Sequence, residues 1–210
     1  DRPYHPHYTH TVFRGWYDFG GGSMADMGIY SLWPVFTALD LGVPVSAEAW
    51  KTHTCTIEDG VSRTVTNDFA YPTGCTIRLK FAARGNRPAL DLFWYDGGMR
   101  PMRIPEMEDG MEMGAGGTLY VGDKGKILND KIFPRSLAGS YTPPAPYIPS
   151  SPGHEQEWLD ACRGGKPAGS DFEWAGPLTE TVLLGNIAIR KELREILNGK
   201  LLMFDPEKFC

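Results

Sequence analysis

The order of the predicted elements indicates an α+β fold: a large, mostly antiparallel β-sheet with helices packed on one face. The observations behind this are a helical pattern near the start of the chain, several strand-like runs in its middle and two helical patterns at its end. The 210 residues suffice for one sizeable domain or two small ones. We predict an extended segment over residues 1–22, which shows no regular period, leading into an α+β domain over residues 23–210.

The first helix is predicted from Ser23 to about residue 41. Ser23 is a good N-cap, because its hydroxyl can accept a hydrogen bond from an otherwise unpaired backbone N–H. Asp26 then places a negative charge in the first turn, where the helix dipole favours it. Gly42 ends the pattern. Pro34 removes one helical hydrogen bond, which predicts a kink or a restart at that position.

The middle of the chain is rich in β-branched and aromatic residues that alternate with polar ones, as in strands of an antiparallel sheet. Strands are expected at residues 47–53, 61–71, 74–81, 90–95 and 118–121. The clearest alternation, in residues 75–81, predicts one buried face and one wetter face. Residues 97–117, rich in glycine and methionine, and residues 134–153, rich in proline, are expected to be loops.

The last third is predicted to be helical over residues 154–163 and again over residues 174–198, with Gly199 ending the second helix. The four cysteines form no CxxC pair, which favours free thiols over a zinc site or a disulfide scaffold. A disulfide between Cys55 and Cys75, in neighbouring strand-like runs, is the open alternative.

The composition disfavours two classes of partner. The net charge is −5 and no basic stretch occurs, so nucleic acid is not expected to bind. No apolar run approaches the ~20 residues of a membrane-spanning helix. The chain opens at Asp1 rather than Met, so the sequence does not fix its compartment.

The stretch GGGSMADMGIY, residues 20–30, is the main candidate for chemistry. Asp26 and Tyr30 are four positions apart and therefore lie on one side of a helix, with Cβ atoms roughly 6 Å apart. One reading is a dipole-favoured charge beside a half-buried tyrosine. The other is a proton-transfer pair, with Tyr30 as acid or base and Asp26 orienting it or a substrate hydroxyl. The glycines do not match a phosphate-binding loop.

The preceding segment alternates aromatic and charged residues, among them Arg14, Trp16 and Asp18. This pattern suits stacking on a sugar ring with charged hydrogen-bonding partners, and it equally suits a packed core. His5, His7 and His10 lack a supporting cysteine or carboxylate pattern, so no metal site is predicted.

Three stretches resemble one known family. FRGWYDFGGGSMADMGIYSLWPVFTALDLGVP (13–44), GTLYVGDKGKIL (117–128) and SPGHEQEWLDACRGGKPAGSDFEWAGPLTETVLLGNIAIR (151–190) are similar to the C-terminal domain of the Gfo/Idh/MocA oxidoreductases, chiefly their bacterial branches. The resemblance implies a dihydrodipicolinate reductase-like α+β domain that binds substrate. It also implies an N-terminal Rossmann domain for NAD or NADP, whose GxGxxG motif is absent here. Cytoplasm and periplasm of a bacterium both remain open.

The resemblance further implies roles for individual residues. The family's Asp-x-x-x-His signature corresponds to Asp26 and Tyr30, with tyrosine in place of the usual histidine. Under this reading Asp26 and Tyr30 are catalytic, and Gly28 lets the nicotinamide or the substrate ring approach the helix. The first candidates for the substrate pocket are Arg14, Trp16 and Asp18.

The implied function is the substrate-binding domain of a nicotinamide-dependent oxidoreductase that acts on a sugar, polyol or related carbohydrate by hydride transfer. The catalytic lysine of the family is missing, so this chain alone is expected to be inactive and to work when joined to its Rossmann domain. The alternatives are a non-catalytic carbohydrate-binding or oligomerisation module and a relative of NAD-dependent glycosidases. The resemblance also implies a homo-oligomer that forms through the sheet face.

Overall fold

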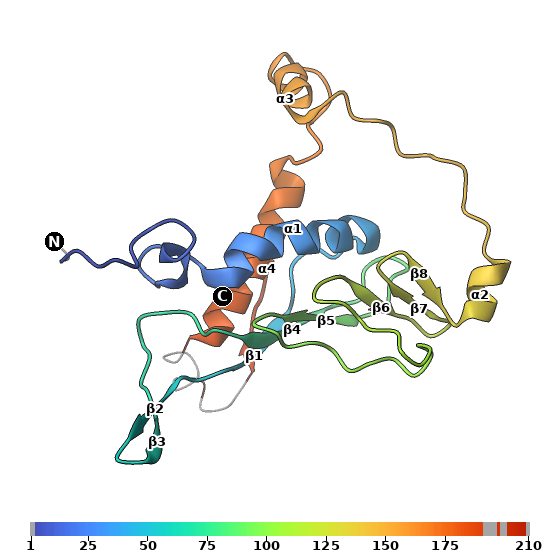
Figure 1. Cartoon of the computed structure of the whole chain (residues 1–210). Coiled ribbons are helices and arrows are strands. Elements are labelled where there is room, and N and C mark those ends of the chain that lie inside the picture. The colour runs from blue at the N-terminus through green and yellow to red at the C-terminus, as the bar shows by residue number, and fades with distance from the viewer. Residues whose placement is uncertain (1–2, 191–196, 198–200, 209–210) are drawn as a thin grey trace. The chain divides into compact units, whose positions relative to one another are not determined.

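The structure, a computed structural model, describes residues 3–190, 197 and 201–208 (Figure 1). It divides into two compact units. The first contains the described residues up to Pro101 and those from Gly176 onward, and the second runs from Met102 to Ala175. The division into residues 1–22 and 23–210 stays a prediction.

The first unit is built on a four-stranded sheet in the order β5-β4-β1-β9, in which all neighbours are antiparallel. Its elements are η1 (Phe13–Gly15), α1 (Gly22–Leu39), β1 (Ser46–Lys51), β2 (Cys55–Glu58), β3 (Val61–Thr64), β4 (Cys75–Phe81), β5 (Leu90–Tyr95), β9 (Leu202–Met203) and α4 (Phe172–Ile189), whose first four residues belong to the second unit. The predicted α+β class with an antiparallel sheet is confirmed.

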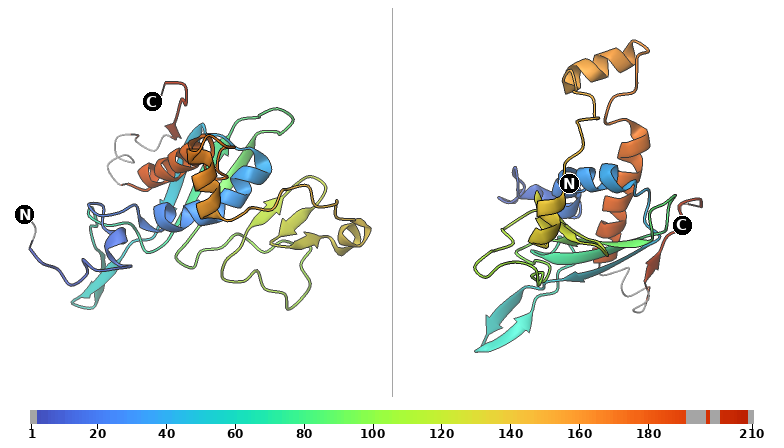
Figure 2. Two further views of the ribbon diagram at one scale, coloured as in Figure 1. Left: turned by 90° about the horizontal axis from the view of Figure 1, so that it is seen from above. Right: turned by 90° about the vertical axis from the view of Figure 1, so that its right-hand side faces the viewer.

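Helices α1 and α4 cover one face of this sheet, as the right-hand view of Figure 2 shows. The side chains of β4 alternate strictly between buried and half-buried, because successive residues of a strand point to opposite faces. The Phe36 ring of α1 meets the Phe81 ring of β4 edge-on, with 6.0 Å between centroids. A Cβ added to Gly185 of α4 would lie 3.4 Å from Cδ1 of Ile77. The core of the unit therefore lies between the sheet and the two helices.

Helix α1 differs from its prediction at two points. It begins at Gly22 and its N-cap is Gly21, so Ser23 lies inside the first turn and does not cap the helix. It also continues through Pro34 without the restart that this residue predicts. The neighbouring Val35 and Phe36 are both buried, and their burial offsets the hydrogen bond that the proline ring removes.

The strands β2 and β3 form a hairpin that extends away from the sheet (Figure 1). All eight strand residues are exposed. The sequence predicts one strand over residues 61–71, but the strand ends at Thr64 and β2 was not predicted. After the hairpin the chain reverses direction in a turn. In this turn the side chain of Asn67 accepts hydrogen bonds from the N–H groups of Phe69 and Ala70.

The second unit has a three-stranded antiparallel sheet in the order β6-β7-β8. Its elements are β6 (Leu119–Val121), β7 (Lys126–Leu128), β8 (Lys131–Phe133), α2 (Arg135–Ser140) and α3 (His154–Cys162). Its core joins Leu128 and Phe133 of the sheet to Ile104 and Met107 of the preceding segment. Residues 97–117 are thus a loop that supplies part of a core, which explains their apolar side chains.

The prediction that residues 134–153 are only loop is wrong, because they contain α2. Helix α3 begins at the predicted residue, and α4 begins two residues earlier than predicted. Residues 191–198 of the predicted last helix lie outside the described residues, except Leu197, which is helical. Cys55, Cys75 and Cys162 are free thiols, so the alternative of a Cys55–Cys75 disulfide is wrong.

Candidate active site

Helix α1 separates two kinds of residue at its head. Met24 and Gly28 are buried, whereas Asp26 and Tyr30 are exposed. This division follows the helical period, since residues four apart share a side and a residue two positions away lies on the opposite side. The two predicted catalytic residues therefore share the solvent side of α1.

Asp26 forms an ion pair with Arg14. The short helix η1 ends with Arg14 in its last turn, and the chain then runs through the glycine segment to α1. Both side chains are about two-fifths exposed. The structure thus brings together a carboxylate and a guanidinium that the sequence singled out separately. A pair of this kind offers hydrogen-bond acceptors and donors side by side to a hydroxylated ligand.

Tyr30 is 72% exposed. A tyrosine hydroxyl has an ordinary pKa near 10 and needs a neighbouring cation to act near neutral pH. The cation that the structure places near the head of α1 is Arg14, and its charge is engaged with Asp26. The described residues thus supply the carboxylate and the phenol of the predicted set.

Gly28 is buried on the side of α1 that faces α4. A Cβ at this position would lie 3.2 Å from Sδ of Met24 and 3.4 Å from Cγ2 of Val182. The close approach of the two helices therefore accounts for this glycine. From the sequence, Gly28 was expected to let a nicotinamide or substrate ring approach the helix. That role stays a prediction, and the burial of Gly28 against α4 does not support it.

The tri-glycine segment is held by a residue that the sequence did not single out. Asn186 of α4 is 4% exposed, and its Nδ2 donates a hydrogen bond to the carbonyl oxygen of Gly21 at 2.8 Å. A Cβ on Gly21 would come within 2.9 Å of this amide. The Gly22 backbone has a φ of +64°, and a Cβ there would lie 2.7 Å from the Tyr71 ring. A side chain at Gly21 or Gly22 would therefore collide with its neighbours, which explains why both residues are glycine.

Trp16 lies at the centre of an aromatic cluster. The rings of His5 and Tyr8 meet it edge-on at centroid distances of 5.4 and 5.3 Å, and Phe69 stacks on it at 5.4 Å with an interplanar angle of 29°. Trp16 is half-buried as a result, while Asp18 is exposed. Trp16 is thus packed, and its role in binding a sugar ring stays a prediction.

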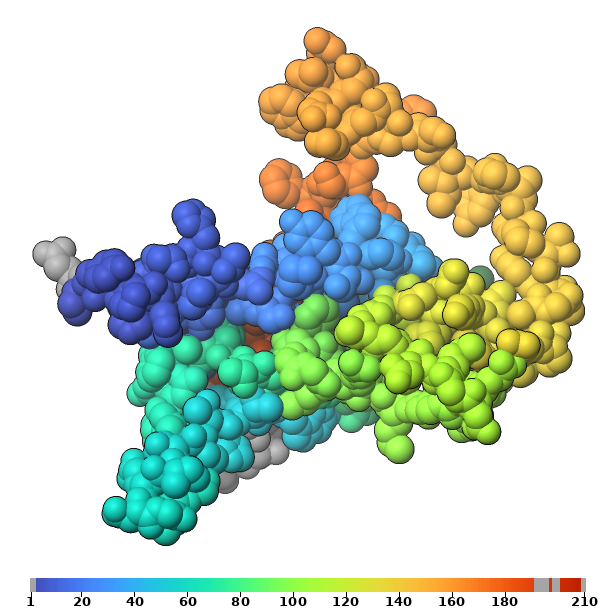
Figure 3. All heavy atoms as spheres, in the orientation of Figure 1, coloured from blue at the N-terminus to red at the C-terminus, as the bar shows by residue number. Residues whose placement is uncertain are grey.

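Residues 69–71 form the second side of this cluster. They run antiparallel to residues 15–17, with hydrogen bonds from the Tyr17 N–H to the Phe69 carbonyl oxygen (2.9 Å) and from the Tyr71 N–H to the Gly15 carbonyl oxygen (2.8 Å). In Figure 3 the dark-blue N-terminal segment lies on the blue-green part of the chain. An antiparallel contact between segments so far apart in sequence leaves no local signal.

Arg190 and Tyr71 both contact the ring of Tyr17. The guanidinium of Arg190 lies 4.6 Å from the centre of the Tyr17 ring, and the Tyr17 and Tyr71 rings meet edge-on at 4.7 Å. Burial raises the pKa of Tyr71 above its ordinary value, and the positive charge of Arg190 opposes this shift. Tyr71 therefore stays a neutral phenol at neutral pH.

Residues 3–190, 197 and 201–208 contain neither a candidate metal site nor a membrane-spanning helix. No group of three or more histidine, cysteine, aspartate and glutamate side chains is arranged there to hold a metal ion. No helix in that part of the chain has both the length and the apolar character needed to cross a bilayer.

Comparison with models of protein families gave one match. Residues 1–91 match a family model described as "Oxidoreductase family, C-terminal alpha/beta domain". The matched region contains η1, α1 and the strands β1 to β4, and hence every residue of the candidate site except Asn186 and Arg190. A search of the curated proteins found no match.

Proposed function

We propose that this chain, whose residues 1–91 match the model of the C-terminal domain of the Gfo/Idh/MocA oxidoreductases, belongs to that family and binds the substrate of a nicotinamide-dependent sugar or polyol oxidoreductase. The observation that carries the proposal is the ion pair between Arg14 and Asp26 beside the exposed Tyr30. The match over residues 1–91 supports the oxidoreductase family, and the carbohydrate and the cofactor are further parts of the proposal.

Arg14 and Asp26 would bind neighbouring hydroxyls of the substrate. A carboxylate accepts hydrogen bonds from hydroxyl groups, and a guanidinium donates several in a fixed planar geometry. Because the two groups already contact each other, little side-chain freedom is lost when a ligand binds. Asp26 in this role orients the substrate and does not itself move a proton.

Tyr30 would move the hydroxyl proton of the reacting carbinol. In the oxidising direction, the carbinol carbon loses a hydride, its hydroxyl loses a proton to the ionised Tyr30, and a carbonyl group forms. The tyrosine needs a stabilising cation for this step. The family resemblance assigns that cation to a lysine of the Rossmann domain.

The nicotinamide, NAD or NADP, would supply the hydride chemistry when bound. Gly28 is buried against α4, so no contact with the nicotinamide is proposed for it. The residues of this chain that fit are on the solvent side of α1, where Asp26 and Tyr30 are exposed. Their work is to hold the substrate hydroxyls and to accept the proton.

The test joins this chain to a nicotinamide-binding domain and measures turnover of a carbohydrate panel. Tyr30→Phe should lower kcat by about 10²-fold or more, as expected when a general acid or base is lost. Asp26→Asn should lower kcat/KM strongly. Asp40→Asn is the matched control, because Asp40 pairs with Arg84 at the other end of α1. Unchanged turnover in Tyr30→Phe would refute the catalytic role.

A second candidate is a non-catalytic carbohydrate-binding module, which the high exposure of Tyr30 favours. The same experiment separates the two. A module of this kind binds carbohydrates, loses that binding in Asp26→Asn, and shows no turnover with either cofactor.

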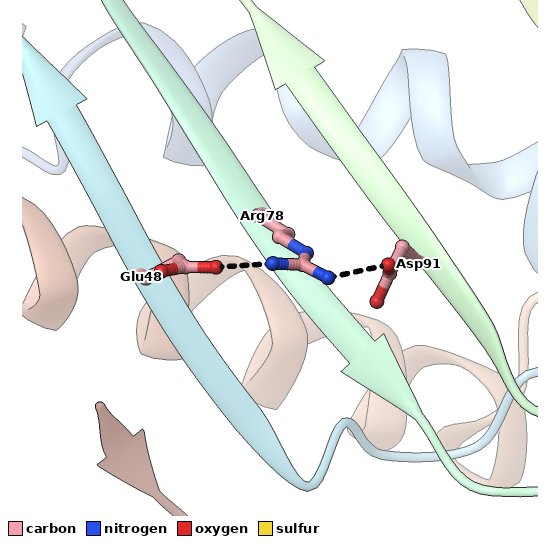
Figure 4. A network of polar contacts seen from close by, with 3 residues as sticks. All are labelled: Glu48, Arg78 and Asp91. Atoms are coloured by element: carbon pink, nitrogen blue, oxygen red, sulfur yellow. Dashed lines mark hydrogen bonds and ion pairs between the residues drawn. The ribbon is translucent and has the colours of Figure 1, made fainter.

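We also propose that the chain forms a homo-oligomer through the sheet face opposite the helices. There Arg78 of β4 donates hydrogen bonds to Glu48 of β1 and Asp91 of β5 (Figure 4). The registers place Trp50 and Phe93 on this face, and both are about half exposed. Large exposed apolar side chains around a network of paired charges are typical of an interface between subunits.

Sedimentation velocity tests the oligomer. The wild-type chain should sediment as a dimer or larger species, and Trp50→Glu should shift it to the monomer. Ile57→Glu, on the exposed β2–β3 hairpin, is the control and should keep the wild-type mass. A monomeric wild type would refute this part of the proposal.

A further inference from the structure

We propose that Met111 and Met113 form a reversible oxidation site, and that their conversion to sulfoxides opens the core of the second unit. All residues of this site belong to that unit, so the inference goes beyond the proposed function and does not depend on it. Three observations carry it: the concentration of methionines in one segment, the small core on which they pack, and the graded exposure of their side chains.

Methionines are concentrated at the start of the second unit. The chain contains eight, and four of them lie in one short segment: Met102, Met107, Met111 and Met113. Oxidants convert the apolar thioether of methionine into a polar sulfoxide, and reductases specific for the two epimers reverse the change. Half of the thioethers that this chemistry can modify are therefore close together in the sequence.

The core of the second unit depends on these side chains. Its buried members and the partly buried side chains packed against them are Ile104, Met107, Leu128 and Phe133, and Met111, Met113 and Leu119. Methionines thus supply three of these side chains. Because β6, β7 and β8 have only three residues each, the unit has little other apolar surface to bury, and each core side chain contributes much to its stability.

Exposure separates the four methionines into three kinds. Met102 is 90% exposed and lies outside this core cluster, so an oxidant reaches it freely but its sulfoxide disturbs no packing there. Met107 is 4% exposed, so the folded core shields its sulfur. Met111 and Met113 are half-buried and pack on the core. Among the four, these two are both accessible to an oxidant and packed where a polar group is costly.

The modification is an oxygen-atom transfer from a hydroperoxide. The sulfur attacks one peroxide oxygen, an S–O bond forms, and the O–O bond breaks. The departing oxygen keeps the proton and leaves as an alcohol, or as water when the oxidant is hydrogen peroxide. The sulfur is oxidised by two electrons and the peroxide is reduced by two, so no further reactant is needed.

A sulfoxide at Met111 or Met113 changes the packing of this core. Its S–O group is polar, and burying it without a hydrogen-bond partner costs free energy. The modified side chains therefore leave the core for solvent, and the sulfur of Met107 becomes accessible in turn. Oxidation of the two half-buried methionines thus makes the buried one reactive.

The backbone around the two residues permits this movement. The Met111 N–H donates to the carbonyl oxygen of Glu108 at 3.1 Å, which closes a turn of exposed residues. Glu112, between the two methionines, and residues 114–117 after them are also exposed. Both side chains can therefore turn out to solvent without drawing other buried residues with them.

The test is treatment of the whole chain with hydrogen peroxide, followed over time by peptide mass mapping. Met102 should be modified first and Met111 and Met113 next. Met107 should react about tenfold or more slowly than Met102 until Met111 and Met113 are sulfoxides. Hydrogen exchange on the same samples should rise about tenfold or more for amides of residues 119–133 and stay unchanged in β4 and β5. Methionine sulfoxide reductases for both epimers should restore the slow exchange.

Three variants locate the response. The double variant Met111→Leu with Met113→Leu keeps the apolar volume but has no thioether at these positions, so its hydrogen exchange should not respond to peroxide. Met102→Leu is the matched control and should respond as the wild type does. Met111→Gln with Met113→Gln places polar groups of similar length there and should exchange like the oxidised wild type without any oxidant.

Three results would overturn the inference. The first is unchanged exchange in residues 119–133 after Met111 and Met113 have become sulfoxides. The second is an equal response of the double leucine variant and the wild type. The third is modification of Met111 and Met113 only after denaturant is added. Each of them leaves the proposed carbohydrate function standing, because that function is measured by binding and turnover.

Discussion

The Nδ2 atom of Asn186 lies 2.8 Å from the carbonyl oxygen of Gly21 and joins two residues 165 positions apart. This hydrogen bond connects α4 to the segment that leads into the helix of Asp26 and Tyr30. Gly21 is also the acceptor for the Ala25 N–H of the first turn of α1. The start of α1 is therefore fixed from the far end of the chain.

We expect Asn186→Ala to lower the free energy of unfolding by about 1 kcal/mol, the net worth of a typical intramolecular hydrogen bond. The loss stays modest because Oδ1 of Asn186 is buried without a hydrogen-bond partner, and the same substitution removes that unpaired atom. Urea denaturation measures the change.

Two further variants sharpen this prediction. Asn186→Asp replaces the donor by a carboxylate next to a carbonyl oxygen, so it should cost more than Asn186→Ala. Thr179→Ala, at an exposed position of the same helix, should stay within about 0.5 kcal/mol of the wild type. If Asn186→Asp were no worse than Asn186→Ala at neutral pH, the hydrogen bond would have no part in stability.

Substitutions at Gly28 test whether this glycine is needed for the packing of α1 against α4 or for the approach of a nicotinamide or substrate ring. An added methyl would meet the flexible Met24 side chain, so Gly28→Ala should change stability little, and Gly28→Leu should lower it by about 1–3 kcal/mol through overpacking. Thermal unfolding measures both. Carbohydrate affinity in Gly28→Ala should equal that of the wild type. A large loss of affinity at unchanged stability would instead support the ring-approach role.

Cys75 should resist alkylation in the folded chain. Burial, together with the charge and the hydrogen bond of Asp96, raises the pKa of its thiol well above the ordinary value, so the reactive thiolate is scarce. Cys55 and Cys162 are exposed. Iodoacetamide at pH 8 followed by peptide mass mapping should modify these two and spare Cys75. Denaturant should expose Cys75, and its rapid modification without denaturant would contradict the described burial.

Glu106 should make the second unit sensitive to acid. Its ion pair with Lys126 and a backbone hydrogen bond lower the pKa of the carboxyl group below the ordinary 4.5. A lowered native pKa means that the stabilisation is complete above pH 4.5 and is lost as the pH falls through the native value. Urea midpoints measured from pH 6 down to pH 3 should fall less steeply in Glu106→Gln than in the wild type. Parallel curves would show that the pair does not contribute.

The sequence predicted those parts of the fold that rest on local pattern. The alternation in residues 75–81 correctly marked β4 and its buried face, and β5 was predicted at its observed bounds. Helix starts at the head of α1, α3 and α4 were right to within two residues. Each of these signals comes from the period of side chains along a single element.

Contacts between distant segments could not be predicted in the same way. The pairing of residues 15–17 with residues 69–71 and the hydrogen bond of Asn186 depend on which segments meet in space, and neither leaves a period in the sequence. The same distinction applies to the residues of the candidate site. Asp26 and Arg14 were named from spacing and composition, whereas Phe69 and Asn186 became visible only through their neighbours.

The first unit is built from two separate parts of the chain, and this affects how the chain folds during synthesis. Strands β1, β4 and β5 are complete at Tyr95, well before α4 begins at Phe172, and Gly185 of α4 packs on Ile77 of β4. Until then part of the apolar face of the sheet has no cover, and α1 alone must shield it. Unpaired apolar surface of this kind aggregates and is the usual ligand of chaperones. Nascent chains that stop before residue 176 should therefore recruit chaperones far more strongly than chains released after residue 190.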